Sequence, residues 1–173
     1  MQMHFITGQI ISIAAFIVAV AVVHCKQVKN ALLGGAALNM LFALSYLFLG
    51  GISGSWICIA ATILTLGLYY INQQEERKRK VIRIIWCILF TFVYITGTVL
   101  SYRKWNDILT CVCAIVHMTS VFQSKMNRYR NLTICNMLLW IIYDFTTMAY
   151  INLITHISVL CSTVTAKVRL DWK

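Results

Sequence analysis

The chain has 173 residues, of which 60% are hydrophobic and 12% are charged, with a mean hydropathy of +0.77 and a formal net charge of +10. Soluble domains are about half apolar and a quarter charged, so this composition excludes a soluble enzyme, including any Rossmann or P-loop domain. The Lys and Arg residues lie in short gaps between apolar runs, where they act as topology signals, so we expect no binding of nucleic acid.

Seven apolar runs long enough to cross a bilayer follow one another along the chain. They cover residues 5–24, 31–49, 54–72, 81–101, 107–124, 131–149 and 153–169. The first run lacks the basic start and the A-x-A cleavage pattern of a signal peptide, so we expect it to be retained as a span. Tight turns are expected at 50–54 and near 150–152. The sequence therefore predicts an all-α transmembrane protein with a single membrane domain.

The distribution of charge predicts how these spans are oriented. With seven spans, all but two of the fifteen Lys and Arg residues fall on one side, and only Arg103 and Lys104 lie on the other. Ser and Thr residues dilute the last span, but omitting it makes the distribution less asymmetric. Because cytoplasmic loops carry the excess of Lys and Arg, we expect an outside N-terminus and a cytoplasmic C-terminus. The basic face should then contact anionic lipids.

A ten-residue string occurs in both the second and the sixth span. Asn-Met-Leu-Phe-Ala-Leu-Ser-Tyr-Leu-Phe at 39–48 aligns without gaps with Asn-Met-Leu-Leu-Trp-Ile-Ile-Tyr-Asp-Phe at 136–145, and five positions are identical. Spans that are four apart run in the same direction through the membrane. The repetition predicts two parallel three-helix repeats, 5–72 and 107–169, joined by an inverting fourth helix at 81–101.

Several stretches resemble a known family, the YgjV-type bacterial inner-membrane proteins within the PQ-loop and SWEET (MtN3-like) superfamily. These stretches are residues 8–9, 15–17, 44–50 and 140–145. The resemblance implies a bacterial cytoplasmic-membrane location and a 3+1+3 arrangement of seven helices. The Pro-Gln pair that names the superfamily is absent, and Val23-His24 occupies roughly its place. The resemblance thus implies the fold more than it implies sugar transport.

Asp144 is the only acidic residue in the interior of a predicted span, and ionisable groups inside a bilayer are functional candidates. It lies six residues before Tyr150 at the last turn, and His156 lies six residues beyond it. An antiparallel hairpin would therefore bring both to one depth, about 9 Å from the turn at 1.5 Å per residue. Such a pair can relay a proton, bind a cation, or simply fix a helix interface. The equivalent positions of the first repeat, Leu47 and Ile59, are apolar, which favours a function.

The other candidate residues lie on the second, fifth and sixth spans. Two pairs are seven residues apart, and each shares a helix face: Asn39 with Tyr46, and Asn136 with Tyr143. Trp140 joins the second face. Amide, phenol and indole groups around a cavity suit an uncharged or zwitterionic polar solute, whereas Asn-to-Asn contacts would instead join the repeats. His117 lies in mid-span and is either a hydrogen-bonded core residue or a ligand of the solute.

Motifs for catalysis or metal binding are missing from the sequence. It contains no H-E-x-x-H, no G-x-S-x-G and no CxxC, so we expect no enzyme, no cofactor and no metal. The sequence favours a carrier for a small polar solute, with proton coupling as an option, and a homo-oligomer is compatible with it. The alternative is a non-transporting membrane receptor. A polar stripe running through both repeats would favour transport, and a pocket closed on one side would favour a receptor.

Overall fold

The computed structural model describes residues 2–147 and 149–171, and seven helices occupy this part of the chain. They are α1 Gln2–Val23, α2 Val28–Leu49, α3 Ile52–Ile71, α4 Glu76–Ser101, α5 Asn106–Val121, α6 Met126–Thr146 and α7 Tyr150–Asp171. Each predicted span overlaps one helix, and the described residues form no strand. The predicted all-α class is therefore confirmed.

The helix bounds differ from the apolar runs mainly at the basic end of the bundle. Helices α2, α4 and α6 begin about one turn earlier than predicted, because the Lys, Arg and Glu residues there are good helix formers although they are polar. The turn predicted near 150–152 comes earlier, because α6 ends at Thr146 and α7 already begins at Tyr150; Met148 is outside the described residues. The N–H of Thr147 donates to the carbonyl of Tyr143 at 3.0 Å and that of Ala149 to the carbonyl of Asp144 at 2.9 Å, which closes α6.

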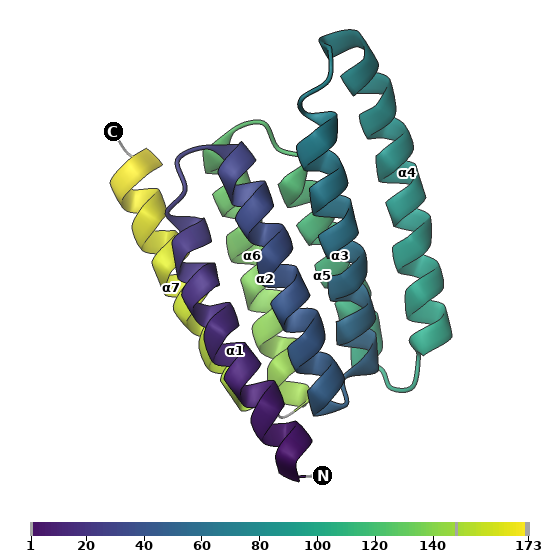
Figure 1. Cartoon of the computed structure of the whole chain (residues 1–173), viewed down its shortest axis with the longest axis vertical. Coiled ribbons are helices and arrows are strands. Elements are labelled where there is room, and N and C mark those ends of the chain that lie inside the picture. Colours follow the sequence, from purple (N-terminus) through teal and green to yellow (C-terminus); the bar gives the residue numbers. More distant parts are fainter. Residues whose placement is uncertain (1, 148, 172–173) are drawn as a thin grey trace.

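Two groups of three helices form the body of the bundle (Figure 1). In each group the middle helix contacts both others: α2 packs against α1 and α3, and α6 packs against α5 and α7. The groups meet where α1 contacts α7 and α3 contacts α5. Helix α4 lies outside and packs against α3 and α5. Helix α1 begins and α7 ends at opposite ends of the bundle (Figure 1).

The outer surface is apolar. On α4, Ile88, Phe92 and Leu100 are 66%, 68% and 82% exposed, and soluble monomers rarely expose continuous apolar areas of this kind. Of the described helices, α1, α2, α3, α4 and α7 are long and apolar enough to cross a membrane. Helix α5 is apolar but has only 16 residues, and α6 begins with a polar stretch. The surface is that of a membrane protein, and the crossing of all seven helices stays a prediction.

Helices α3 and α4 are joined by two reciprocal contacts between a tryptophan and a glycine. A Cβ atom on Gly67 of α3 would lie 2.3 Å from Trp86 of α4, and one on Gly97 of α4 would lie 1.7 Å from Trp56 of α3. Trp86 also donates its indole N–H to the carbonyl of Leu64 at 3.2 Å. Only a residue without Cβ lets the indole rings approach the facing backbone this closely.

Replacing Gly67 by Ala is expected to destabilise the bundle by about 1–3 kcal/mol, the usual effect of overpacking. The new methyl group displaces the Trp86 ring and breaks its hydrogen bond. Gly35→Ala is the matched control, because the nearest atom to its new Cβ is a Thr65 methyl carbon at 4.0 Å, and Ala is the better helix former. Thermal unfolding in detergent micelles measures both. Equal unfolding temperatures for the two variants would contradict the packing role of Gly67.

Candidate functional site

Asp144 on α6 is fully buried and is held from two other helices. Its Oδ2 lies 2.6 Å from Nδ1 of His156 on α7, and its Oδ1 accepts the hydroxyl proton of Tyr46 on α2 at 2.7 Å. All three side chains are at most 2% exposed. The predicted pairing of Asp144 with His156 is confirmed. Tyr46 is a partner from the other group of helices that the sequence did not reveal.

Arg103 and Lys104, the two basic residues predicted on the outer side, lie beside a different carboxylate. Their backbone N–H groups donate to Oδ2 of Asp107 at 2.8 and 2.9 Å. The hydroxyl of Ser53 on α3 donates to Oδ1 of Asp107 at 2.6 Å. Asp107 therefore braces the short connection between α4 and α5 and leaves Asp144 to Tyr46 and His156.

The Asp144–His156 pair can exist in two charge states. With a neutral imidazole that donates from Nδ1, the pair carries one negative charge, and with a second proton on the ring it is neutral overall. Burial makes an uncompensated charge expensive, so each member of the pair needs its hydrogen-bond partners. A buried Asp–His pair has the chemistry either of a proton site or of a fixed helix interface.

Aromatic rings surround this pair. The ring of Trp140 stacks with those of Tyr46 and His156, with centroids 5.7 Å apart in each case and interplanar angles of 19° and 22°. Phe42 lies 4.8 Å from the His156 ring, and Tyr143 meets Trp140 edge-on at 5.4 Å. These contacts fix the orientations of the imidazole and the phenol, so neither ring turns without the other members of the cluster.

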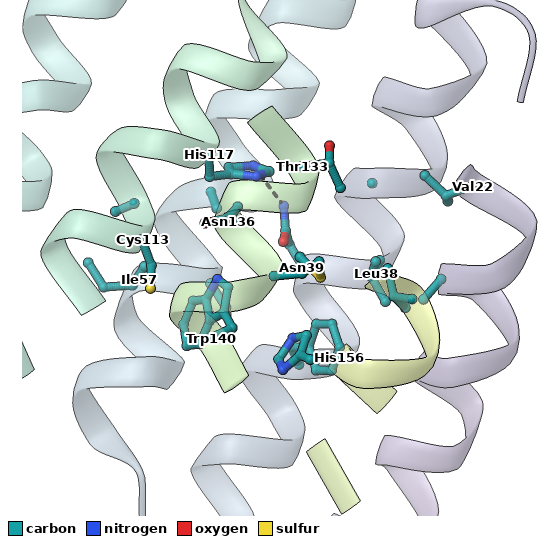
Figure 2. Close-up of a pocket in the computed structure, with 18 of the residues that line it drawn as sticks. Val22, Leu38, Asn39, Ile57, Cys113, His117, Thr133, Asn136, Trp140 and His156 are labelled. Carbon is teal, nitrogen blue, oxygen red and sulfur yellow. Dashed lines mark hydrogen bonds between the residues drawn. The ribbon is translucent and has the colours of Figure 1, made fainter. Parts of the chain in front are cut away.

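A cavity of about 60 Å³, here called the central cavity, adjoins the aromatic cluster between the two groups of helices (Figure 2). Six of the predicted site residues line it: Asn39, Tyr46, His117, Asn136, Trp140 and His156. The other two predicted residues, Tyr143 and Asp144, lie behind this lining. The volume suffices for a few water molecules and is well below the 300–1,000 Å³ of typical ligand pockets. A larger solute therefore needs the helices to move apart.

The two asparagines of the repeated string have different surroundings. The amide nitrogen of Asn39 lies 3.4 Å from Nε2 of His117, as Figure 2 shows, and the hydroxyl of Thr65 lies 3.5 Å from the same atom. His117 is thus a hydrogen-bonded histidine at the cavity wall. Asn136 lines the same cavity, and its buried Oδ1 has no hydrogen-bond partner among the described residues. An unpaired buried acceptor suits a ligand or water that donates a hydrogen bond.

A second hollow, here called the vestibule, has a volume of about 420 Å³ and opens where α2 turns into α3 and α4 connects to α5. Arg103, Lys104 and Asp107 line it together with Tyr143. Tyr46 is the one described residue that lines both the vestibule and the central cavity. The two hollows therefore border on the same side chain, that of Tyr46.

Polar groups connect the vestibule with the central cavity. Ser53, which donates to Asp107, also lies 3.1 Å from the hydroxyl of Tyr143. The Tyr143 ring touches that of Tyr46, with centroids 6.1 Å apart, and Tyr46 binds Asp144. Polar groups from both groups of helices thus lie between the vestibule and the central cavity, and a ring contact rather than a hydrogen bond joins Tyr143 to Tyr46. The sequence did not identify Ser53 and Asp107 as site residues, because each is a single polar residue at the edge of an apolar run.

A further polar cluster joins the first and last helices. The hydroxyl of Ser12 on α1 donates to Oδ1 of Asn152 on α7 at 2.7 Å and lies 2.7 Å from that of Ser45 on α2. All three side chains are fully buried. The cluster lies apart from both hollows and acts as a structural connection. No group of three or more metal-ligating side chains occurs within the described residues.

Comparison with known proteins gives one match. The family model described as "Imp-YgjV: Bacterial inner membrane protein" matches residues 6–173, which include almost all of the seven helices. No curated protein and no solved structure gives a significant match. The match thus indicates the membrane in which the protein resides, and the chemistry has to be inferred from the site.

Proposed function

Because the chain belongs to the Imp-YgjV family of bacterial inner membrane proteins, we propose that it is a small carrier that moves a polar solute across that membrane. The observation that carries this proposal is the pair of hollows that share Tyr46 as a lining residue. One opens at the α2–α3 turn, and the other lies between the helix groups. A carrier that works by alternating access needs such a site with a thin barrier between it and one face of the membrane.

The proposed architecture has two parallel repeats, 5–72 and 107–169, joined by the helix at 81–101, as in the PQ-loop and SWEET superfamily. The helix contacts support it, because exchanging α1, α2 and α3 for α5, α6 and α7 reproduces the same set of contacts among these six helices. The charges support an outside N-terminus. The vestibule end holds Arg103 and Lys104, whereas the opposite end holds most of the basic residues. The vestibule would then face outward and all seven helices would cross the membrane.

In the proposed cycle the two groups of helices rock about the central cavity. Asn39, Asn136 and Trp140 hold the solute by hydrogen bonds and stacking. The Asp144–His156 pair takes up or releases one proton when the barrier opens, because opening separates Tyr46 from the carboxylate and admits water. Whether the proton moves with the solute or against it depends on the membrane face to which the pair is open when solute is bound and when it is absent.

One observation favours the alternative of a non-transporting receptor: the central cavity is small and Tyr46 separates it from the vestibule. The polar residues that both groups of helices place at the two hollows favour the carrier, since a receptor needs polar groups on one side only. The two functions differ in whether bound solute reaches the other side.

Uptake by proteoliposomes at two pH values, across a panel of labelled polar metabolites, tests the proposal. We expect at least one solute to accumulate above the level in protein-free liposomes and Asn136→Ala to reduce its uptake several-fold. Asn131→Ala is the matched control, because Asn131 is exposed, contacts Lys167 and does not line the cavity. Solute that protects the protein against thermal unfolding without entering the liposomes would overturn the carrier in favour of the receptor.

A further inference from the structure

A third hollow, here called the basic hollow, lies at the end of the bundle opposite the vestibule and has a volume of about 370 Å³. It is formed where α2 begins, α3 ends, α4 begins and α5 connects to α6. Its polar lining consists of Lys29, Tyr69, Asn72, Gln73, Arg79, Arg83, Gln123 and Ser124. It therefore touches both groups of helices and the outer helix α4.

Three cations converge on the basic hollow, and no carboxylate of the residues that the structure describes lines it. The acids nearest in sequence are engaged elsewhere: Glu75 pairs with Lys78 at 3.6 Å and Glu76 with Lys80 at 3.3 Å. Arg79 and Arg83 are four residues apart on one helix face, so they repel each other. Within the described part of the chain the hollow thus holds uncompensated positive charge, which a bound anion would relieve.

Two of the three cations are held in place by groups that do not neutralise them. The ammonium of Lys29 lies 5.5 Å from the centre of the Tyr69 ring, and the guanidinium of Arg83 lies 5.4 Å from the centre of the Phe122 ring. Arg83 also donates to the carbonyl of Phe122. Cation–π contacts orient a cation while leaving its charge available. The hollow is thus pre-organised for an anion.

The position of the basic hollow indicates which kind of anion it binds. Arg79 and Arg83 lie at the boundary where α4 passes from its basic first turn to its apolar, exposed surface. Ile84, Ile85 and Ile88, directly beyond them, are 62%, 59% and 66% exposed. A phosphate group in the hollow that is joined to acyl chains would lay those chains on this surface, whereas a free phosphate would leave it without a specific partner.

We propose that the basic hollow binds the phosphate headgroup of an anionic phospholipid, whose acyl chains lie along the exposed face of α4. Basic pockets between membrane helices bind such headgroups elsewhere. The bound lipid links α2 and α3 to α4 and to the α5–α6 connection. The site is independent of the proposed transport role, since none of its residues lines the central cavity.

Lipid binding to the purified protein in detergent tests the site, with native mass spectrometry and thermal unfolding as readouts. The probes are phosphatidylglycerol, phosphatidylcholine and inorganic phosphate. The test variant is Lys29→Gln with Arg79→Gln, which leaves the Arg83 contact intact. The control is Arg77→Gln with Arg128→Gln, which removes the same charge from exposed residues outside the hollow.

We expect phosphatidylglycerol to bind and stabilise the wild type and the control, and the test variant to bind it about 30-fold more weakly. Without lipid, the unfolding temperature should be the same for the wild type, the test variant and the control. Lys29→Glu, a change at an exposed side chain, serves as a second test variant. Equal stabilisation by inorganic phosphate would overturn the lipid in favour of a free anion. Equal weakening in test and control variants, or equal binding of phosphatidylcholine, would overturn the site.

Discussion

Replacing Asp144 by Asn is expected to leave the protein folded and to remove the pH dependence of solute uptake. The Asn side chain has the same shape, accepts the Tyr46 hydroxyl proton through its amide oxygen and keeps its place beside His156. It has no negative charge, so a proton on His156 loses its compensating partner. Uptake by proteoliposomes with and without an imposed pH gradient measures the effect: the wild type should respond to the gradient, and the variant should not.

A control variant and the nature of the neighbouring groups make this prediction specific to Asp144. Asp107→Asn changes the vestibule carboxylate, which binds Ser53 and backbone N–H groups, and should retain the pH dependence. The other titratable groups around Asp144 are phenols and thiols, which are neutral near neutral pH. Persistence of the pH dependence in Asp144→Asn would show that the proton is held elsewhere.

The stability and the pH dependence of variants at Asp144 and His156 together distinguish a proton site from a purely structural pair. His156→Leu alone leaves the buried carboxylate without its main partner and should destabilise the bundle by about 3–5 kcal/mol. Combining it with Asp144→Leu removes the buried charge as well and should restore most of that stability. If the double variant also transports with unchanged pH dependence, then the pair only fixes the interface of α6 and α7.

Replacing Tyr46 by Ala is expected to join the vestibule and the central cavity into one open path. Its ring is 2% exposed and lines both hollows, so its removal eliminates the barrier between them. Release of solute from preloaded proteoliposomes should become several-fold faster and should no longer saturate. Folding has to be verified by size exclusion, because removing a large buried ring costs about 3–5 kcal/mol.

Tyr46→Phe is the control for this leak. It keeps the ring and the stacking on Trp140 but removes the hydrogen bond to Asp144. We expect it to remain tight and to change only the pH dependence. A Tyr46→Ala protein that folds and retains solute as well as the wild type would contradict the role of this ring as the barrier.

The sequence predicts the helices of this fold well and their packing poorly. Apolar runs of about twenty residues separated by charged gaps indicate helices in a membrane, and each run overlaps one helix. The outer position of α4 was not predictable. A helix that meets lipid on one face and apolar helices on the other has little amphipathic pattern to show which face is which.

The site was predictable where it depends on one hairpin and not where it depends on distant helices. Counting residues from the last turn placed Asp144 beside His156, because α6 and α7 are adjacent and antiparallel. The same counting could not place Tyr46 beside Asp144, since that contact depends on how α2 faces α6. The repeated string also suggested equal roles for Tyr46 and Tyr143, yet one binds Asp144 and the other lies beside Ser53.

The tryptophan–glycine contacts make α3 and α4 a single stiff unit. If α1–α3 rock against α5–α7 as proposed, α4 travels with α3, and sliding concentrates where α4 meets α5. Asp107 holds the backbone of that connection at Arg103 and Lys104, which places the pivot at the vestibule end. Helix α4 then transmits force from the surrounding lipid to α3. A change in bilayer thickness or lateral tension would alter the central cavity through this helix, without a ligand.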